Sequence, residues 1–359
     1  MKSYVHIMSK KKLICNNHRY RLFSKGCKLY IEDILKKEVK KVIIPVFIVE
    51  KLLSYFLITR RLFRLEPRCG CFIDEELVIF SMRGKIYNIN LNTNIITVEH
   101  SFKKGMNNPL FFTEIKDIEG FENGIIYGEY IGRGINDTVD IYMRVKNKKW
   151  KKVYSFPQNT IKHIHNIIPS KKQKCLYILT GDNDLESGIW KMTSGFNKCI
   201  KIVGGSQKYR GCFAFEEEEG LVYASDIPTK ENFLYYLNYS DLSLNILMPI
   251  SGPCIYGMKL NSGDYIFSTS VEPNDNTNGI KALFCFKKGF GVKDNKSHLY
   301  IGNLKKGFVD IYQEEKDFFP MPLFGLGVFQ FPCNKSEDIY ITCQALKKLD
   351  GCTLKINRS

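Results

Sequence analysis

Residues 124–226 contain three similar phrases, Tyr127-Gly128-Glu129-Tyr130, Tyr177-Ile178-Leu179-Thr180-Gly181-Asp182 and Tyr223-Ala224-Ser225-Asp226. Each phrase is typical of a short apolar strand that ends in a small residue and a carboxylate. A turn-rich gap and a second strand with an aromatic residue follow each one, and related phrases occur at residues 78–81 and 265–270. The repeat recurs about every 45–50 residues, which is the period of a four-stranded propeller blade. We therefore expect the whole chain to be organised around it.

The fold class that this repeat predicts is an all-β propeller, with residues 1–359 as a single domain. Complete blades are expected near residues 69–102, 110–156, 161–203, 210–250 and 254–304. A last unit near residues 328–356 is one strand short, and we expect residues 19–45 to supply its missing strand, because propellers commonly close by joining their two termini. This gives six blades, or seven if residues 19–45 form a blade of their own.

Residues 46–65 break the strand pattern. The segment is apolar almost throughout, contains no glycine or internal proline, and predicts one inserted α-helix of about five turns. A cluster of three arginines shortens its apolar run too much for a transmembrane span. Three roles remain open: packing on the side or end of the propeller, lying in a membrane interface with the arginines on headgroups, or forming a dimer contact.

Charge and cysteine content restrict the partners and the compartment. The formal net charge of +16 favours anionic partners, but the lysines are scattered and no RNA-binding signature is present, so nucleic acid is not expected. The first 13 residues do not resemble a secretory signal, and we expect the 12 cysteines to be reduced thiols. A cytoplasmic protein is therefore predicted, with a peripheral position at the inner face of the membrane as an alternative.

Three carboxylates of the repeat are expected to converge. In a propeller, the ends of the inner strands face a central channel, so equivalent positions in different blades meet in space. Glu129, Asp182 and Asp226 would then point toward one mouth. The alternative is that each carboxylate ends a strand and accepts hydrogen bonds from loop amides.

His163-Ile164-His165 is the most distinctive pair among six histidines. Both belong to a predicted innermost strand, where residues two apart point to the same side. Two imidazoles on one side of such a strand can ligate one divalent metal ion or share acid–base work, and the alternative is a pair of hydrogen-bonded histidines that fills the channel.

Further residues are candidates for binding an anionic substrate. Gln207 and Arg210 open the fourth blade, where Arg210 can act as a bidentate clamp or can bridge the carboxylates instead. Arg61 and Arg64 precede the first full blade and can reach the same mouth, and Tyr130 can stack on a sugar ring. Templates for nucleotide-binding loops, serine hydrolases and zinc proteases are absent from the sequence.

The order GEY, HIH, TGD, Gln207-x-x-Arg210 and SD, over about residues 60–285, resembles the sialidase-like (BNR-repeat-like) β-propeller proteins. The resemblance implies a six- or seven-bladed propeller and a carbohydrate context. The Asp-box of true sialidases is not present. The HxH pair with a nearby Gln is also similar to metal-using oligogalacturonate lyases of the propeller type.

These observations predict a protein that binds or cleaves an acidic or phosphorylated glycan, or a lipid-linked glycan, in surface-polysaccharide metabolism. Glycoside hydrolysis would use Glu129 and Asp182 as paired carboxylates, with His163 or His165 as proton shuttle or metal ligand. The first alternative is a metal-assisted lyase that uses the histidines and Arg210. The second is a non-catalytic scaffold that docks proteins or a membrane through residues 46–65.

Overall fold

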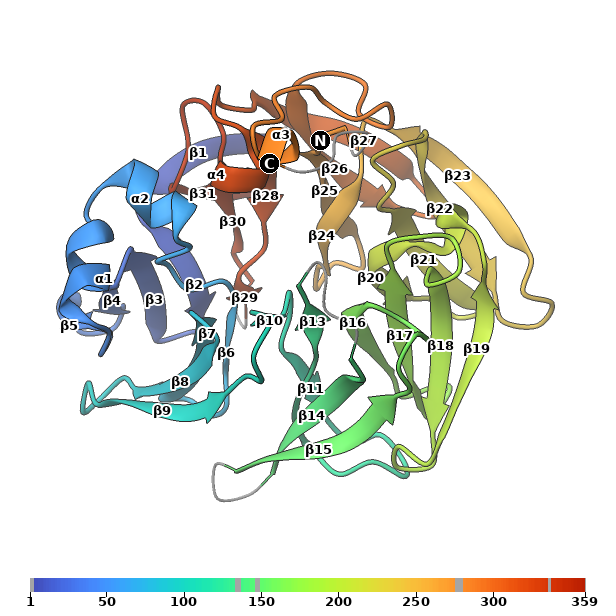
Figure 1. Cartoon of the computed structure of the whole chain (residues 1–359), viewed down its shortest axis with the longest axis horizontal. Coiled ribbons are helices and arrows are strands. Elements are labelled where there is room, and N and C mark those ends of the chain that lie inside the picture. Colours follow the sequence, from blue (N-terminus) through green and yellow to red (C-terminus); the bar gives the residue numbers. More distant parts are fainter. Residues whose placement is uncertain (1–2, 133–136, 146–148, 275–279, 335–336, 359) are drawn as a thin grey trace.

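The protein is a ring of antiparallel sheets, seen down its shortest axis in Figure 1. This computed structural model describes residues 3–132, 137–145, 149–274, 280–334 and 337–358. Within these residues, strand pairing and chain order give seven four-stranded units. The predicted all-β propeller is confirmed. Units six and seven share one eight-stranded sheet, because β25 also pairs with β28.

The first three units take the chain from residue 12 to residue 156. Unit one comprises β2 (Lys12–Asn16), β3 (Tyr20–Lys25), β4 (Lys28–Asp33) and β5 (Glu38–Ile43). Unit two comprises β6 (Gly70–Phe72), β7 (Leu77–Met82), β8 (Lys85–Asn90) and β9 (Ile96–Ser101). Unit three comprises β11 (Thr113–Ile115), β12 (Gly124–Gly128), β14 (Val139–Val145) and β15 (Lys149–Phe156).

The next three units have the same meander. Unit four comprises β16 (His163–Ser170), β17 (Cys175–Gly181), β18 (Gly188–Thr193) and β19 (Lys198–Gly204). Unit five comprises β20 (Gly211–Glu216), β21 (Gly220–Ser225), β22 (Asn232–Asn238) and β23 (Leu244–Ile250). Unit six comprises β24 (Cys254–Lys259), β25 (Tyr265–Val271), β26 (Lys296–Asn303) and β27 (Gly307–Glu315).

The seventh unit is shared between the two ends of the chain. It comprises β28 (Gly327–Gln330), β30 (Ile339–Gln344), β31 (Thr353–Arg358) and, from the N-terminus, β1 (Ser3–Ser9). The predicted closure by both termini is therefore confirmed, but the strand comes from residues 3–9 and not from residues 19–45, which build unit one. Three two-residue strands join neighbouring units, namely β10 (Met106–Asn107), β13 (Tyr130–Ile131) and β29 (Cys333–Asn334).

Apolar clusters between neighbouring units hold the ring together. Leu13 and Phe23 of unit one pack with Tyr340 of unit seven, and each of the other six neighbouring pairs shares a cluster of its own. Burial falls from the first strand of a unit to the fourth: β16 is mostly buried, whereas β19 is partly exposed. Burial of apolar surface between blades is thus the main force that closes the ring.

Residues 46–65 form two short helices instead of the single helix expected. They are α1 (Ile48–Leu53) and α2 (Leu57–Leu62). The hydroxyls of Ser54 and Thr59 donate to carbonyls of Lys51 and Leu53, which satisfies the backbone where the first helix ends. Two more short helices are α3 (Ile280–Leu283) and α4 (Met321–Phe324). In Figure 1 they lie near the top of the ring, and α4 contacts both α2 and α3. Among the described residues, no helix combines the length and hydropathy of a membrane span.

Candidate metal centre

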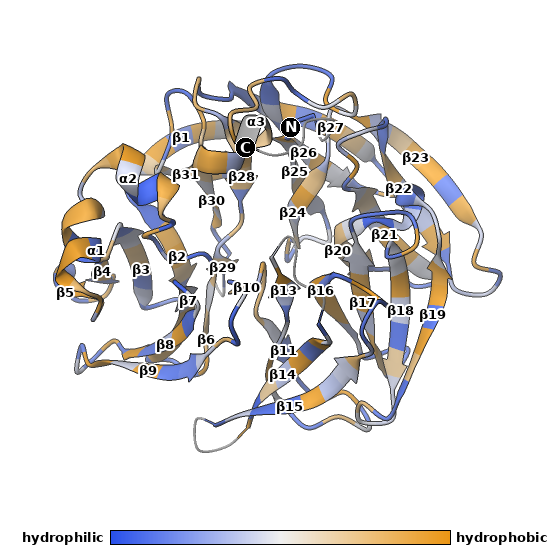
Figure 2. Ribbon diagram, in the orientation of Figure 1, coloured by the Kyte–Doolittle hydropathy of each residue, from blue (hydrophilic) through white to orange (hydrophobic). Residues whose placement is uncertain are grey.

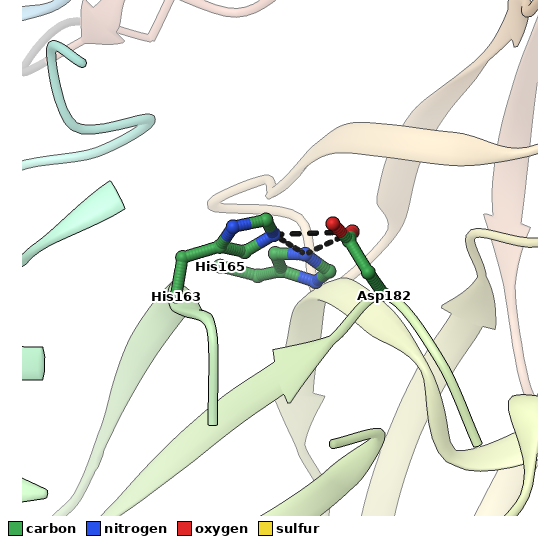
Figure 3. Close-up of side chains that lie close together, drawn as sticks. All are labelled: His163, His165 and Asp182. Atoms are coloured by element: carbon green, nitrogen blue, oxygen red, sulfur yellow. Dashed lines mark hydrogen bonds and ion pairs between the residues drawn. The ribbon is translucent and has the colours of Figure 1, made fainter. Parts of the chain in front are cut away.

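His163 and His165 lie at the start of β16, the innermost strand of unit four. The pairing of β16 with β17 shifts register between Ile164 and Asn166, so His165 occupies a β-bulge. A bulge re-aims the side chains beside it, and such features are common next to functional sites. The two imidazoles therefore converge, as Figure 3 shows, with their Nε2 atoms 3.1 Å apart.

Asp182 completes a group of three converging side chains. It follows the last residue of β17, and its Oδ1 lies 3.1 Å from Nε2 of His163 and 4.0 Å from Nε2 of His165. The two imidazoles are buried, whereas the Asp182 side chain is 35% exposed. One nitrogen from each ring and one carboxylate oxygen thus face a common point that is open on the Asp182 side.

The hydrogen bonds fix which ring atoms face that point. Nδ1 of His165 lies 3.0 Å from the carbonyl of Gly211, to which it must donate, so Nε2 of the neutral ring carries a lone pair. Nδ1 of His163 is buried without a hydrogen-bond partner in the described parts of the chain, so the polar contacts of this ring go through Nε2. Nε2 of His163 therefore faces the lone pair of His165 and the Asp182 carboxylate, which repel one another unless a proton on His163 or a cation lies between them.

The protonation states agree with this arrangement. Burial and, to a smaller extent, the neighbouring His163 lower the pKa of His165 to about 4, so the ring is neutral near pH 7. Burial alone would raise the pKa of Asp182, but the hydrogen bond from His163 and the charge of Arg210 outweigh it and hold this pKa well below its usual range. The centre therefore offers a neutral His165 ring, the Nε2 atom of His163 and an ionised Asp182 carboxylate.

Asp182 is held in place through its backbone as well as its side chain. Nε2 of Gln207 and Nη1 of Arg210 donate to the Asp182 carbonyl at 2.9 and 3.0 Å. Nη2 of Arg210 lies 3.5 Å from Asp182 Oδ1. Gln207 and Arg210, predicted as substrate-binding residues, thus both contact the centre, and both position Asp182.

Arg210 also binds the third predicted carboxylate. Its Nε donates to Oδ2 of Asp226 at 3.2 Å, and Sγ of Cys212 lies 3.3 Å from the same oxygen. The pKa of Cys212 is raised well above its usual value, because the thiol is buried and lies beside Asp226, so it stays protonated. His165, Cys212 and Asp226 also lie close enough together for a metal, but a protonated thiol is a poor ligand.

Tyr130 forms one wall of the centre. Its ring stacks on His163 with centroids 4.0 Å apart and an angle of 11° between the planes. The guanidinium of Arg68 lies 5.4 Å from the Tyr130 ring centroid. The tyrosine therefore packs against the imidazole instead of presenting a free face to a sugar, and Arg68 adds positive charge beside it.

Glu129 has contacts of its own, away from the histidines. Its carboxylate lies 2.9 Å from Nζ of Lys103 and accepts a hydrogen bond from the amide of Asp140 at 2.9 Å. Its backbone carbonyl accepts the Ile164 amide at 3.0 Å. Glu129 is thus adjacent to β16 through its backbone, while its side chain belongs to a buried ion cluster on unit three.

Arg61 and Arg64 contact α4 and the loops beside it. Arg61 is buried, forms an ion pair with Asp317 and donates to the carbonyl of Phe324 at 2.7 Å. Nη2 of Arg64 donates to the carbonyl of Pro322 at 3.2 Å. These contacts join unit two to the segment before unit seven, and none of them involves the two histidines or Asp182.

Sequence reasoning missed Arg68, Lys162 and Cys212. Nζ of Lys162 lies 4.0 Å from Oδ2 of Asp182, and its side chain is 31% exposed. Lys162 precedes the histidine pair directly, and Cys212 lies two residues after Arg210, so proximity to the predicted residues was the available signal. Arg68 carries no comparable signal, because it is one of several basic residues between residues 60 and 68.

The distances fit a divalent ion. Two ligand atoms about 2.1 Å from one ion, seen at about 90–110°, lie about 3.0–3.4 Å apart. The two separations of 3.1 Å that involve His163 fall in this range, and the 4.0 Å between His165 and Asp182 corresponds to a wider angle at the ion. Imidazole and carboxylate suit zinc and manganese. The hydrogen bond from His165 to Gly211 is the outer support that metal-binding histidines usually have. His163, His165 and Asp182 therefore form a fitting ligand set.

Comparison with known proteins shows which solved structures have a similar fold. No protein-family model matches this chain, and no curated protein matches it. An oligogalacturonate lyase solved in complex with manganese is similar, with a TM-score of 0.57 and 10% identity over 99% of this chain and 91% of that one. An oligogalacturonate lyase from Vibrio parahaemolyticus has a TM-score of 0.55 and 11% identity over 99% and 97%.

A chain of the mitotic checkpoint complex is similar to the same degree, with a TM-score of 0.55 and 7% identity over 99% of this chain and 93% of that one. At these identities the likeness establishes the propeller fold, which serves lyases and an assembly protein alike. The function of this chain therefore depends on the residues at its site and not on the fold alone.

Proposed function

We propose that this protein is a metal-dependent lyase acting on an acidic glycan, with His163, His165 and Asp182 as the metal ligands. The observation that carries the proposal is the convergence of two Nε2 atoms and one carboxylate oxygen, with His165 fixed by Gly211. The fold likeness to a lyase solved with manganese supports the choice of chemistry.

A lyase fits the geometry better than the hydrolase that the sequence first favoured. Hydrolysis needs two carboxylates about 5–10 Å apart on either side of the scissile bond. The Glu129 carboxylate is engaged by Lys103 and the Asp140 amide, and the Asp182 carboxylate is engaged by His163 and Arg210. The described contacts therefore do not assemble Glu129 and Asp182 as an acid and nucleophile pair.

The reaction class is β-elimination on a uronate unit. A base removes the proton from the carbon next to the carboxylate, a carbon–carbon double bond forms, and the glycosidic bond breaks with its electron pair on the departing sugar oxygen. A divalent ion bound to the substrate carboxylate would withdraw charge and make that proton more acidic. The product carries an unsaturated uronate at its new non-reducing end.

The surrounding residues suit an anionic substrate. The charges of Asp182, Asp226 and Arg210 sum to −1, so a divalent ion would bring these groups to a net charge of +1 for a substrate carboxylate. Lys162 is partly exposed beside Asp182 and can bind a second anionic group. Arg210 helps to hold Asp182 in position through its carbonyl and carboxylate.

The test is to incubate the purified protein with manganese and a panel of uronate-containing oligosaccharides, and to follow the ultraviolet absorbance of the conjugated unsaturated product. We expect absorbance to rise with at least one acidic glycan and to stop when the metal is chelated. Neutral glycans serve as the control. Reducing ends that appear without the conjugated absorbance would show hydrolysis and contradict the proposal.

A further inference from the structure

The helix pair α1 and α2 has its apolar side chains outward and its charges inward. The buried residues of α2 are Arg60 and Arg61, and α1 has no buried residue. Six large apolar side chains are 51–79% exposed, and we call them the outer apolar patch: Phe47, Ile48, Val49, Leu52, Phe56 and Ile58. A surface helix of a soluble protein normally has the opposite arrangement.

Two charged residues of this segment form ion pairs with other parts of the protein. Arg61 pairs with Asp317 and Asp350, and Glu50 pairs with Arg83 at 2.9 Å. Because these pairs anchor the polar side, the outer apolar patch cannot turn inward without breaking them. Figure 2 shows both helices coloured mainly as hydrophobic at the outer edge of the ring.

A second group of exposed apolar residues lies on a loop beside α4, which the segment after α1 also contacts. Arg61 and Arg64 of the helix pair bind carbonyls of α4, and the amide of Met321 in α4 binds the carbonyl of Cys285 at 3.2 Å. Phe284, Phe286 and Phe290 on that neighbouring loop are 56–75% exposed. Exposed apolar side chains in this number are typical of an interaction surface.

Basic residues accompany both groups. Nζ of Lys28 lies 3.9 Å from the ring centroid of Tyr55, between α1 and α2, and Lys25 is exposed on the adjoining hairpin. Lys287 is exposed between Phe286 and Phe290. With a net charge of +16, two copies of this chain would bring like charges together, so charge complementarity favours an anionic partner over self-association.

We propose that the outer apolar patch inserts into the interface of an anionic lipid bilayer, with Lys25, Lys28 and Lys287 near the headgroups. Apolar side chains supply the insertion energy, and the basic residues supply attraction that depends on anionic lipid. The segment after α2 leads directly to Arg68, which contacts Tyr130 at the metal centre. Docking does not depend on the lyase proposal.

Vesicle co-sedimentation tests the proposal. We expect the wild-type protein to sediment with vesicles of mixed phosphatidylglycerol and phosphatidylcholine, and less with phosphatidylcholine alone or at high salt. The triple variant Phe47→Ser/Ile48→Ser/Phe56→Ser should bind at least about tenfold more weakly. The matched control Leu185→Ser/Val309→Ser removes exposed apolar residues from other elements and should bind like the wild type.

Two further measurements distinguish insertion into the bilayer from loss of the metal centre. Phe47→Trp should show a blue shift of tryptophan emission when anionic vesicles are added, because the indole enters an apolar environment. The triple variant should keep its thermal stabilisation by manganese, which separates loss of docking from loss of the metal centre. Absence of wild-type binding to anionic vesicles would overturn the proposal. So would a wild-type dimer in sedimentation velocity that the triple variant converts to monomer.

Discussion

Nδ1 of His165 donates to the carbonyl of Gly211 at 3.0 Å, which links the innermost strands of two adjacent units. His165 belongs to β16 of unit four and Gly211 begins β20 of unit five. This contact sets the tautomer of His165 and directs its Nε2 atom at His163 and Asp182. The metal centre thus depends on the register between two blades, not on one strand alone.

Removing both imidazoles should abolish metal binding. In His163→Ala/His165→Ala, Asp182 is left as a single ligand of the set, which cannot hold a divalent ion tightly. We expect the rise in melting temperature on adding manganese chloride to disappear, since ligand stabilisation follows RT ln(1 + [L]/Kd). His18→Ala, which removes an exposed histidine, should keep the full rise. An unchanged rise in the double variant would refute the assigned ligands.

Gly181 should tolerate no side chain. A Cβ atom there would lie 2.9 Å from Cγ of Arg210 and 2.9 Å from Cε1 of His165, so both side chains would have to move. We expect Gly181→Ala to weaken manganese binding at least about tenfold, because small displacements of ligands cost that much in metal sites. Isothermal titration calorimetry on the folded variant measures the affinity. Affinity equal to that of the wild type would show that His165 does not need its present position.

Much of the fold follows from the sequence because propeller blades repeat. Phrases ending at Glu129, Asp182 and Asp226 do mark equivalent second strands, and burial between blades enforces that repeat. The closing strand was misplaced because the lysines at positions 10–12 make the N-terminal segment basic as a whole, although residues 3–9 themselves include Val5 and Ile7 and form an outer edge strand. The length of the helical segment was also wrong, because hydroxyl bonds to backbone carbonyls ended α1 without a glycine or proline.

The site was predicted in part. His163, His165, Asp182, Gln207, Arg210, Asp226 and Tyr130 do come together, since all lie at one end of inner strands. Glu129 shares the repeat position but turns toward Lys103, an ion pair that the spacing of the repeat cannot reveal. Periodicity reports which strand end a residue occupies. Periodicity does not predict which neighbouring residue forms an ion pair with that side chain.

Arg210 should be essential for stability through its two carboxylates. It is 12% exposed, and Asp182 and Asp226 both bind it. Arg210→Met leaves Asp226 buried without its counter-ion, which should cost about 3–5 kcal/mol in unfolding free energy. Adding Asp226→Asn should recover part of that loss, because it removes the buried charge. Chemical denaturation of the four proteins in the cycle measures the coupling, and strictly additive losses would show that the pair does not interact.

Lys162 should contribute charge to substrate binding. Its ammonium lies near Asp182 and is partly exposed, so it can attract an anionic glycan without holding the metal. We expect Lys162→Met to weaken binding of an acidic oligosaccharide and to make binding less sensitive to salt, whereas Lys162→Arg should retain both. Manganese affinity should be similar in both variants. Equal glycan binding by Lys162→Met at low salt would exclude this role.

Glu129 should make stability depend on pH. Burial raises its pKa from 4.5 to about 7, against the opposing effect of Lys103, so the folded state favours the protonated carboxyl. This contribution to stability is fully present below about pH 4.5 and is lost as the pH rises through about 7, a change of at most about 3 kcal/mol. Glu129→Gln stays neutral throughout, so its stability relative to the wild type should rise between these two pH values. Urea unfolding across pH 4–8 measures the difference, with the exposed Glu122→Gln as the matched control that should show none. A constant difference between Glu129→Gln and the wild type over that range would mean that Glu129 is ionised in the folded protein, as its ion pair with Lys103 alone would suggest.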